Sequence, residues 1–260
     1  VVCALAARES IRVRVENASA SVERTCKGGV AARGLPRAAC ALRLARAPAD
    51  AAQRALAERQ HVEEHARPVM GDAFVVVRRI TGGGAIHHTN ELTFSLSASL
   101  EHPLFEGPVA RSYERVHEVV KGALLELGCE AELRGAGELS SDAPDTGMCF
   151  HHSTALDLAW GARKGVGSAQ RRRRGRVLHH GSIKLGPSKY DTDIASLEGV
   201  DDPGEVARAL QGAMRNIAGI KLSPGVPSPK ERELAEELGA RAIDQDFVRS
   251  EEHTSELQSR

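Results

Sequence analysis

The sequence predicts an α+β domain in which helices pack on a mixed or antiparallel sheet. Residues 92–100 indicate a strand, because Leu, Phe and Ala alternate there with Thr and Ser. Residues 111–127 indicate a helix, because apolar side chains recur there at spacings of three and four. Such segments follow one another without a regular βαβ alternation, which favours α+β over α/β architecture.

The composition is that of a globular protein without marked charge. The chain has 260 residues and is 41% hydrophobic, so it can bury a substantial core. Its 35 basic and 35 acidic residues cancel and only 3% are aromatic, so no nucleic-acid partner is expected. No apolar run reaches the roughly 18 residues of a membrane span. Five widely spaced cysteines without a CxxC pair indicate neither disulfides nor a metal cluster, and favour a cytoplasmic location.

The chain divides into three parts by composition. Residues 1–50 are rich in Ala and Arg and show no clear apolar period, so no element is assigned there and a degraded N-terminal part stays open. Residues 51–248 are expected to form one folded domain with a helical tail. Residues 249–260 look like a translated sequencing adapter and are excluded from fold reasoning.

A glycine loop follows the first strand that the sequence predicts. Residues 74–77 form a β-branched run that leads through Arg78 and Arg79 to Gly82–Gly84. Three glycines in a row remove every Cβ, so backbone N–H groups can approach a carbonyl or a phosphate closely. A flexible hairpin turn is the competing interpretation.

The middle of the chain predicts a loop followed by a hairpin or ladder. Residues 135–147 are rich in Gly, Pro and Ser, which indicates a surface loop leading to Cys149. Residues 156–160 alternate and residues 177–185 are strand-like, so strands are expected on both sides of the segment 161–175.

The tail predicts two helices. The first follows Asp202, and its apolar stripe runs to residue 217. The second starts at a capping box formed by Ser228 and Glu231 and is expected to stop at Gly239.

Three blocks in order resemble the biotin/lipoate protein ligases and octanoyltransferases. The first is RRITGGGA at residues 78–85, with His88 and the NELTFS strand at residues 90–95 after it. The second, GARKGVGSAQ at residues 161–170, is similar to the family's lysine loop, and the third, HGSI at residues 180–183, to the strand behind it. The resemblance implies a biotin/lipoate protein ligase-like catalytic domain.

Within this family, the resemblance is greatest to the cysteine-dependent octanoyltransferases, which have a Cys-Phe pair and Gly-Ser-Ala-Gln where this chain has them. It implies that Cys149 is the nucleophile and that Lys164 stabilises the developing oxyanion. A lone cysteine is otherwise a small buried hydrophobe. The substrate-binding residues that the resemblance implies are Arg78, Arg79, Thr81, Gly82, Gly83, Gly84, Ala85, His88, Gly167, Ser168, Ala169, Gln170, His180 and Gly181.

The implied reaction moves an octanoyl or lipoyl group to a lysine without a cofactor. An acyl carrier protein would be the donor, and a lipoyl domain or a glycine-cleavage H-type protein the acceptor. One alternative is an ATP-dependent lipoate-protein ligase, in which ATP and Mg²⁺ would be needed and Cys149 would be incidental. Another is a carrier-binding module without catalysis.

Two further features suggest weaker hypotheses. Three His-His pairs invite a metal site, but neighbouring residues of a strand face opposite sides, so no metal is expected. Arg171–Arg174 and Arg176 form the one strong basic cluster, which is either a solvated face or a docking site for an acidic carrier domain.

Overall fold

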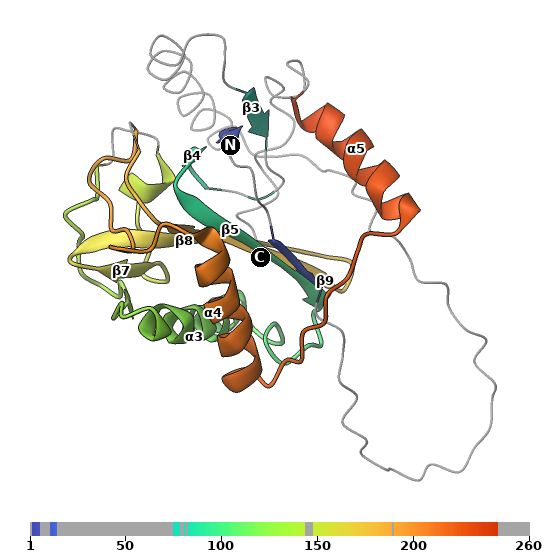
Figure 1. Ribbon diagram of the computed structural model, residues 1–260, viewed down its shortest axis with the longest axis horizontal. Helices are drawn as coiled ribbons and strands as arrows, with labels where there is room; N and C mark the ends of the chain where they lie inside the picture. Colours follow the sequence, from blue (N-terminus) through green and yellow to red (C-terminus); the bar gives the residue numbers. More distant parts are fainter. Residues whose placement is uncertain are drawn as a thin grey trace.

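The computed structural model describes residues 2–5, 11–14, 75–78, 81, 83–143, 148–188 and 190–243. Within these ranges two sheets lie close together (Figure 1). The smaller has the order β3-β1-β4, from β1 (Val2–Leu5), β3 (Val75–Arg78) and β4 (Ile86–His88). The larger has the order β2-β5-β9-β8-β7-β6, from β2 (Ile11–Arg14), β5 (Glu91–Ser99), β6 (Glu132–Leu133), β7 (Leu158–Trp160), β8 (Arg163–Arg173) and β9 (Arg176–Lys184).

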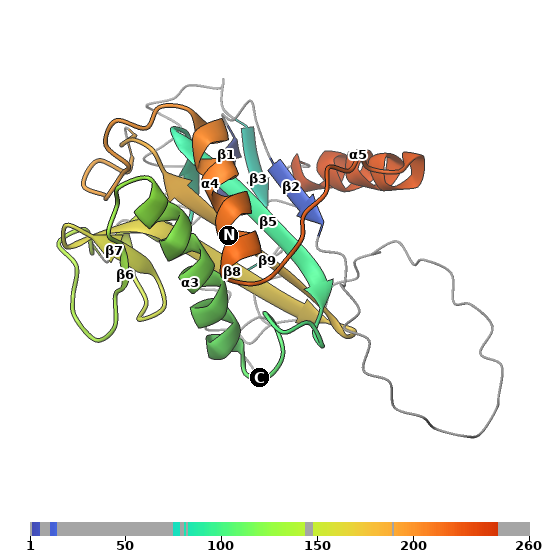
Figure 2. The same ribbon diagram turned by 60° about the horizontal axis from the view of Figure 1, so that its bottom comes forward.

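The strand pairing and the helices give the α+β architecture that the sequence predicts. The pairs β1–β4 and β2–β5 are parallel, and the other pairs are antiparallel. Two helices, α3 (Val109–Glu126) and α4 (Pro203–Asn216), lie side by side over one face of the larger sheet (Figure 2). The third, α5 (Pro229–Ile243), lies beside β3, and η4 (Cys149–His151) is a single 3₁₀ turn.

The core lies between the larger sheet and its two helices. The apolar residues of β5, such as Leu92, Phe94 and Leu96, are buried in one cluster with Val120 of α3 and Leu210 of α4. Each such side chain contributes about 1.5–3 kcal/mol when it is fully buried. The period of two in β5 is therefore confirmed, and it leaves the Thr and Ser residues of that strand on the opposite face.

Helix ends follow the predicted signals with one exception. Asp202 caps α4 by accepting a hydrogen bond from the Gly204 backbone, and Ser228 and Glu231 form the expected capping box. Gly239 was expected to end α5, but that prediction is wrong because the helix continues to Ile243. One glycine costs a helix only about 1 kcal/mol relative to alanine, and the residues behind it include two alanines and an arginine, which favour helix.

Two other expectations need correction. The segment 161–170 is not a loop: most of it is β8, which continues through a turn at Arg174 and Gly175 into β9. In the part of the chain where no element is predicted, β1 and β2 each add a strand to one of the sheets. The alternation of Ile11 and Val13 with arginines was the available signal for β2.

The remaining expectations for the ends of the chain fall on residues 15–74 and 244–260, outside the described ranges. None of the helices that the structure describes is long and apolar enough to cross a membrane.

Candidate active site

Cys149 lies against the end of the glycine loop. Its backbone N–H donates a 2.7 Å hydrogen bond to the Ala85 carbonyl, and Ala85 forms a parallel bridge with Met148. The cysteine opens the η4 turn and is partly exposed. The structure thus joins two blocks that are more than sixty residues apart in the sequence.

Lys164 reaches the same point from β8. Its side chain is buried, and Nζ lies 3.8 Å from the Cys149 sulfur. Nζ also donates to the carbonyls of Cys149 at 2.8 Å and His152 at 3.0 Å, and it pairs with Asp157 at 2.9 Å. The ammonium is therefore held in place by three oxygens with the thiol next to it.

A β-bulge turns Lys164 toward the cysteine. Leu158 pairs with Val166 whereas Ala159 pairs with Lys164, so Gly165 is the extra residue. Without the bulge, Lys164 would share a face with Val166, which is buried in the helix-covered core. With it, the lysine faces the polar side of the sheet.

The environment keeps Lys164 charged. Burial alone lowers the pKa of this lysine, but the Cys149 sulfur and the Asp157 carboxylate more than offset it, so the pKa is raised. Asp157 also accepts a 2.7 Å hydrogen bond from the Thr154 backbone, which fixes its orientation. A fixed ammonium beside a sulfur can stabilise negative charge on the sulfur or on a carbonyl oxygen that the sulfur attacks.

Gly167 leaves space beside these two groups. A Cβ at this position would lie 3.1 Å from Lys164 Cε and 3.6 Å from the Cys149 sulfur. Ala169, two residues further along β8, is on the same face and is also small. The floor next to the thiol is therefore formed by main chain and a methyl group.

The start of the glycine loop is hydrogen-bonded to the face of the larger sheet on which Gly167 and Ala169 lie. Thr81 is buried, and its hydroxyl lies 2.6 Å from His180 Nε2. His180 pairs directly with Ala169, so both side chains lie on the site face of the sheet. Ala85 and Gly167 thus lie next to Cys149, whereas Ala169 and His180 share that face of the sheet and Thr81 bonds His180 there.

Other residues of the loop are less defined. Arg78 ends β3, where it pairs with Val2 of β1. Gly83 has a φ of 103°, which favours glycine, and Gly84 follows it toward Ala85. Arg79 and Gly82 lie outside the described residues.

His88 is paired with a carboxylate that the sequence analysis does not single out. His88 Nδ1 bonds Glu91, whose Oε1 also accepts from Thr93 at 2.8 Å and Ser182 at 3.0 Å. Burial raises the pKa of Glu91, but the hydrogen bonds from His88 and Lys184 and the charges of both residues prevail and hold the pKa at about 2. Glu91 is therefore a buried anion.

Lys184 is a second buried lysine that the sequence analysis missed. Nζ pairs with Glu91 at 2.9 Å and Asp191 at 3.2 Å, and donates to the His87 carbonyl at 2.9 Å. Lys184 Nζ lies 4.7 Å from the centre of the Phe150 ring, and Lys164 Nζ lies 5.6 Å from the same point. The sequence signal for a buried ion pair was the position of Lys184 between Ile183 and Leu185 in a strand, because a charge buried there has to be paired.

Two residues expected in the acyl pocket lie on the other face of β8. The Ser168 hydroxyl bonds His117 Nε2 at 2.8 Å, and the Gln170 amide donates to the Ser112 hydroxyl at 2.9 Å. His117 and Ser112 belong to α3. Strand alternation therefore separates Ser168 and Gln170 from the thiol, and their side chains contact the helix layer instead.

Gly181 belongs to that helix-covered face as well. A Cβ there would come within 2.7 Å of the Phe94 ring and of the Ser168 hydroxyl. The glycine is thus required for packing in the core, and a contact with substrate is not what its position indicates.

Two of the three His-His pairs lie in strands, which direct the two rings of each pair to different partners, whereas His151 and His152 lie at the η4 turn. His87 bonds Ser188 and packs edge-on against Tyr190, whereas His88 bonds Glu91. His179 is buried in the core, and its neighbour bonds Thr81. No group of three or more His, Cys, Asp or Glu side chains suited to a metal occurs among the described residues.

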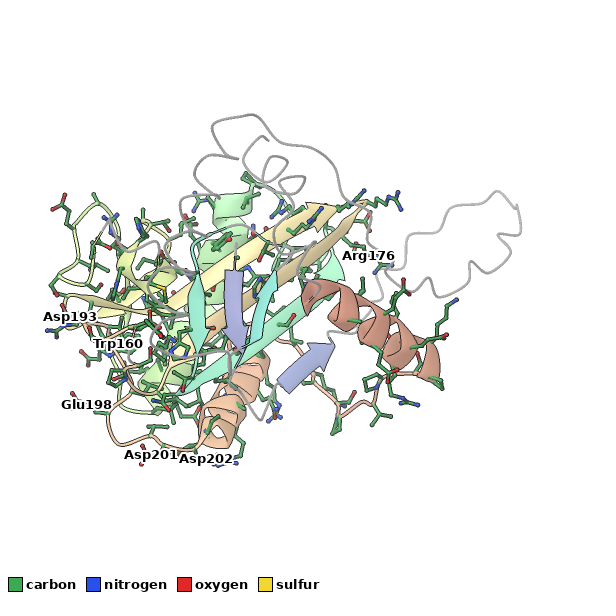
Figure 3. The ribbon with its side chains drawn as sticks, turned by 90° about the horizontal axis from the view of Figure 1, so that it is seen from above. Trp160, Arg176, Asp193, Glu198, Asp201 and Asp202 are labelled. Carbon is green, nitrogen blue, oxygen red and sulfur yellow. The ribbon has the colours of Figure 1, made fainter. Side chains whose placement is uncertain are left out.

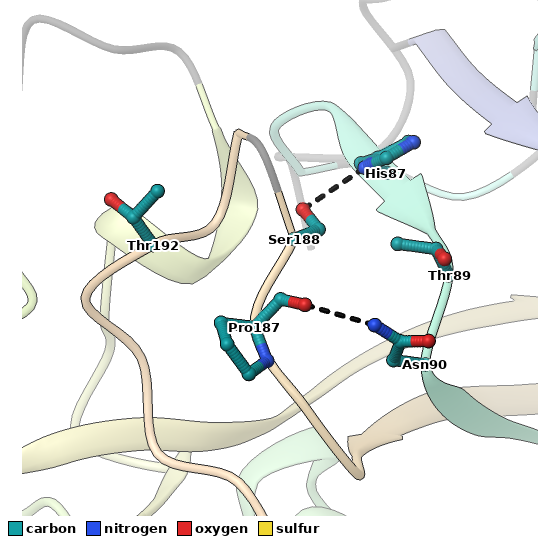
Figure 4. A pocket seen from close by; sticks show the side chains of 6 residues that line it. All are labelled: His87, Thr89, Asn90, Pro187, Ser188 and Thr192. Atoms are coloured by element: carbon teal, nitrogen blue, oxygen red, sulfur yellow. Dashed lines mark hydrogen bonds between the residues drawn. The ribbon is translucent and has the colours of Figure 1, made fainter.

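A surface cavity of about 460 Å³ lies between the β4–β5 turn and the segment behind β9 (Figure 4). Its lining consists of His87, Thr89, Asn90, Pro187, Ser188 and Thr192. Neither Cys149 nor Lys164 lines it. This cavity is therefore separate from the contact between Cys149 and Lys164.

The chain is similar in sequence to known proteins of one family. The model of the lipoyl protein ligase A/B catalytic domain matches residues 57–203. Two relatives are named octanoyltransferase LipM. The one from Moorella thermoacetica is 40% identical over 110 residues, 42% of this chain and 40% of its own length. The one from Kyrpidia tusciae is 31% identical over 195 residues, 64% of this chain and 71% of its own length.

Solved structures share the fold. The Ta0514 protein of T. acidophilum with bound lipoic acid has a TM-score of 0.54 at 23% identity, covering 66% of this chain and 70% of its own. A lipoate-protein ligase A bound with ATP has a TM-score of 0.50 at 25% identity, covering 68% of this chain and 71% of its own. By its sequence match and its fold, the chain belongs to the lipoyl protein ligase A/B catalytic domain family.

Proposed function

We propose that this chain transfers an octanoyl or lipoyl group from an acyl carrier protein to a lysine of a lipoyl domain or an H-type protein, through a thioester on Cys149. The observation that carries the proposal is the ammonium of Lys164, held 3.8 Å from the Cys149 sulfur by Asp157. The LipM relatives support the same reaction. A cytoplasmic location and the absence of any cofactor belong to this proposal.

In the first half-reaction the Cys149 sulfur attacks the carbonyl carbon of the donor thioester. The carbon–sulfur bond to the donor breaks, and the donor thiol leaves with a proton. Lys164 donates a hydrogen bond to the carbonyl oxygen, which carries negative charge in the tetrahedral intermediate. Gly167 leaves the space in which the acyl carbon becomes tetrahedral, because a side chain there would contact the sulfur.

In the second half-reaction a neutral lysine amine of the acceptor attacks the thioester carbon. An amide forms, the bond to Cys149 breaks, and the amine proton returns to the thiol. A thioester is already activated toward an amine, so no adenylate has to be formed in either step. ATP and Mg²⁺ are required only in the ligase alternative.

Intact mass spectrometry after incubation with octanoyl-acyl carrier protein, without ATP, tests the proposal. We expect an octanoyl adduct that hydroxylamine removes, and no such thioester in the Cys149→Ser variant. Acylation of an acceptor only with ATP and free octanoate would identify a ligase. Carrier binding without acyl transfer under either condition would identify a non-catalytic module.

A further inference from the structure

The end of the β8–β9 hairpin carries a cluster of arginines, Arg171–Arg174 and Arg176, which we call the hairpin-end arginines. Arg176 pairs directly with Arg173, an arrangement in which like charges repel. Of the ion pairs formed within the described ranges, none involves Arg173, Arg174 or Arg176. Exposed Arg174 and Arg176 therefore place positive charge at this end of the hairpin, and Arg176 lies far from Trp160 (Figure 3).

One arginine of the cluster holds the hairpin end in place. Arg172 donates to the carbonyls of Phe105 at 3.0 Å and Gly107 at 2.5 Å, and to the Ser112 hydroxyl at 2.9 Å. Burial and the nearby charge of Arg115 lower the pKa of Arg172. The other hairpin-end arginines thus lie on a hairpin that Arg172 attaches by hydrogen bonds to the loop before α3 and to α3 itself.

The cluster and the reactive centre share one face of β8. Pairing between β8 and β9 is regular from Val166 to Arg173, so alternation places Arg171 and Arg173 on the same face as Gly167, beside the thiol. At about 3.3 Å per residue, these arginines begin roughly 13 Å and roughly 20 Å along the strand from Gly167.

We infer that the hairpin-end arginines are the docking surface for an acidic, phosphopantetheine-bearing acyl-carrier donor. The inference rests on the function proposed above, since it assigns a surface to the donor of that reaction. A phosphopantetheine arm spans roughly 16 Å from phosphorus to sulfur by ordinary bond lengths, which matches the separation from the cluster to the thiol. Complementary charge at the rim of an interface mainly speeds encounter.

The same distance argues against the acceptor as the occupant. A lysine side chain spans only roughly 6 Å from Cα to Nζ. An acceptor docked on the hairpin end would have to extend its own fold along the sheet to bring its lysine to a thioester on Cys149, whereas the donor's arm covers that distance by itself. The distance therefore favours the donor as the occupant.

The test compares the Arg174→Glu/Arg176→Glu variant with the parent enzyme. Each is supplied with one of two octanoyl donors, the octanoyl-acyl carrier protein or free octanoyl-pantetheine. Both arginines are exposed, so their replacement spares the core. We expect the concentration of carrier donor for half-maximal acylation of Cys149 to rise about tenfold or more. Octanoyl-pantetheine should acylate variant and parent equally, and higher salt should reduce the difference between them with the carrier. Arg215→Glu, on an exposed position of α4, is the matched control and should change neither donor.

Three results would overturn the inference. If variant and parent need the same concentration of carrier donor, the arginines have no docking role. The proposed function would still stand, because the thioester forms. An unchanged acylation step with slower transfer from acyl-enzyme to the acceptor would reassign the surface to the acceptor. A parent enzyme that accepts an octanoyl group from neither donor would refute the proposed function itself, together with the docking role.

Discussion

The two faces of the larger sheet come from the same strands but are built by different chemistry. The helix-covered face is apolar, and the buried His179 there has a pKa lowered well below its usual value by burial and by two nearby histidines. The opposite face contains two buried lysines, Lys164 and Lys184, each held by carboxylates. Among the described residues, the buried lysines thus lie on one side of the sheet, whereas the other side buries apolar and polar groups and has Arg172 at its hairpin end.

The two lysines also differ from each other in their partners. Lys184 faces two carboxylates, Glu91 and Asp191, and no sulfur. Lys164 faces one carboxylate and the thiol of Cys149. Both lysines are buried, so we expect their partners to decide their roles: Lys184 should serve stability, and Lys164, beside the thiol, should serve the proposed chemistry.

Removing Lys184 should have the largest effect on stability. Lys184→Met leaves Glu91 and Asp191 as uncompensated buried anions, which costs about 3–5 kcal/mol. Urea unfolding measures this loss. Adding Asp191→Asn should recover part of it because the two positions are coupled. A variant as stable as the parent would show that the cluster is not the stabilising element described above.

Removing Lys164 should have the largest effect on chemistry. We expect Lys164→Met to slow octanoyl transfer by about 10²–10³-fold, the usual effect of losing one oxyanion donor. Single-turnover rates, corrected for the folded fraction, measure it. Since Asp157 loses its partner, Lys164→Met/Asp157→Asn controls for the stray carboxylate. A slowing in Lys184→Met as large as in Lys164→Met would abolish the distinction between the lysines.

The Glu91 cluster should make the protein sensitive to acid. The pKa of Glu91 is lowered from 4.5 to about 2, so its contribution is complete above pH 4.5 and disappears as the pH falls through 2. The contribution is of the order of 3 kcal/mol. Stability measured across this window should fall more steeply for the parent than for Glu91→Gln. Parallel curves would argue that Glu91 is not held as an anion.

Two glycines, one on each face of the larger sheet, give the smallest expected effects. Gly181→Ala pushes a methyl into the Phe94 ring and should cost about 1–3 kcal/mol of stability with the transfer rate per folded molecule unchanged. Gly167→Ala crowds Lys164 and Cys149 and should slow transfer with a smaller loss of stability. The reverse pattern in unfolding and single-turnover assays would mean that the faces are assigned wrongly.

Local patterns were enough to predict the fold class, the β5 strand and helix α3. Periods of two and 3.6 depend on neighbouring residues alone. The resemblance to a known family supplied Cys149 and Lys164, which the structure brings together. Their roles stay a prediction until the chemistry is measured.

The parts that could not be predicted depend on distant contacts. The bulge at Gly165 arises from the way β8 pairs with β7, and that bulge decides which face Lys164 occupies. Residues 167–170 do not form one pocket wall, because alternation along β8 directs Ser168 and Gln170 toward the helices. Asp191 and Lys184 meet only after the chain turns behind β9.

The central claim is that the thioester on Cys149 is an intermediate of the transfer. The most direct measurement isolates octanoyl-enzyme, removes the donor, and adds an acceptor lipoyl domain without ATP. We predict that the octanoyl group moves from Cys149 to an acceptor lysine at least as fast as the complete reaction turns over, and far more slowly in Lys164→Met. An isolated adduct that stays on the cysteine while the complete reaction proceeds would contradict the claim.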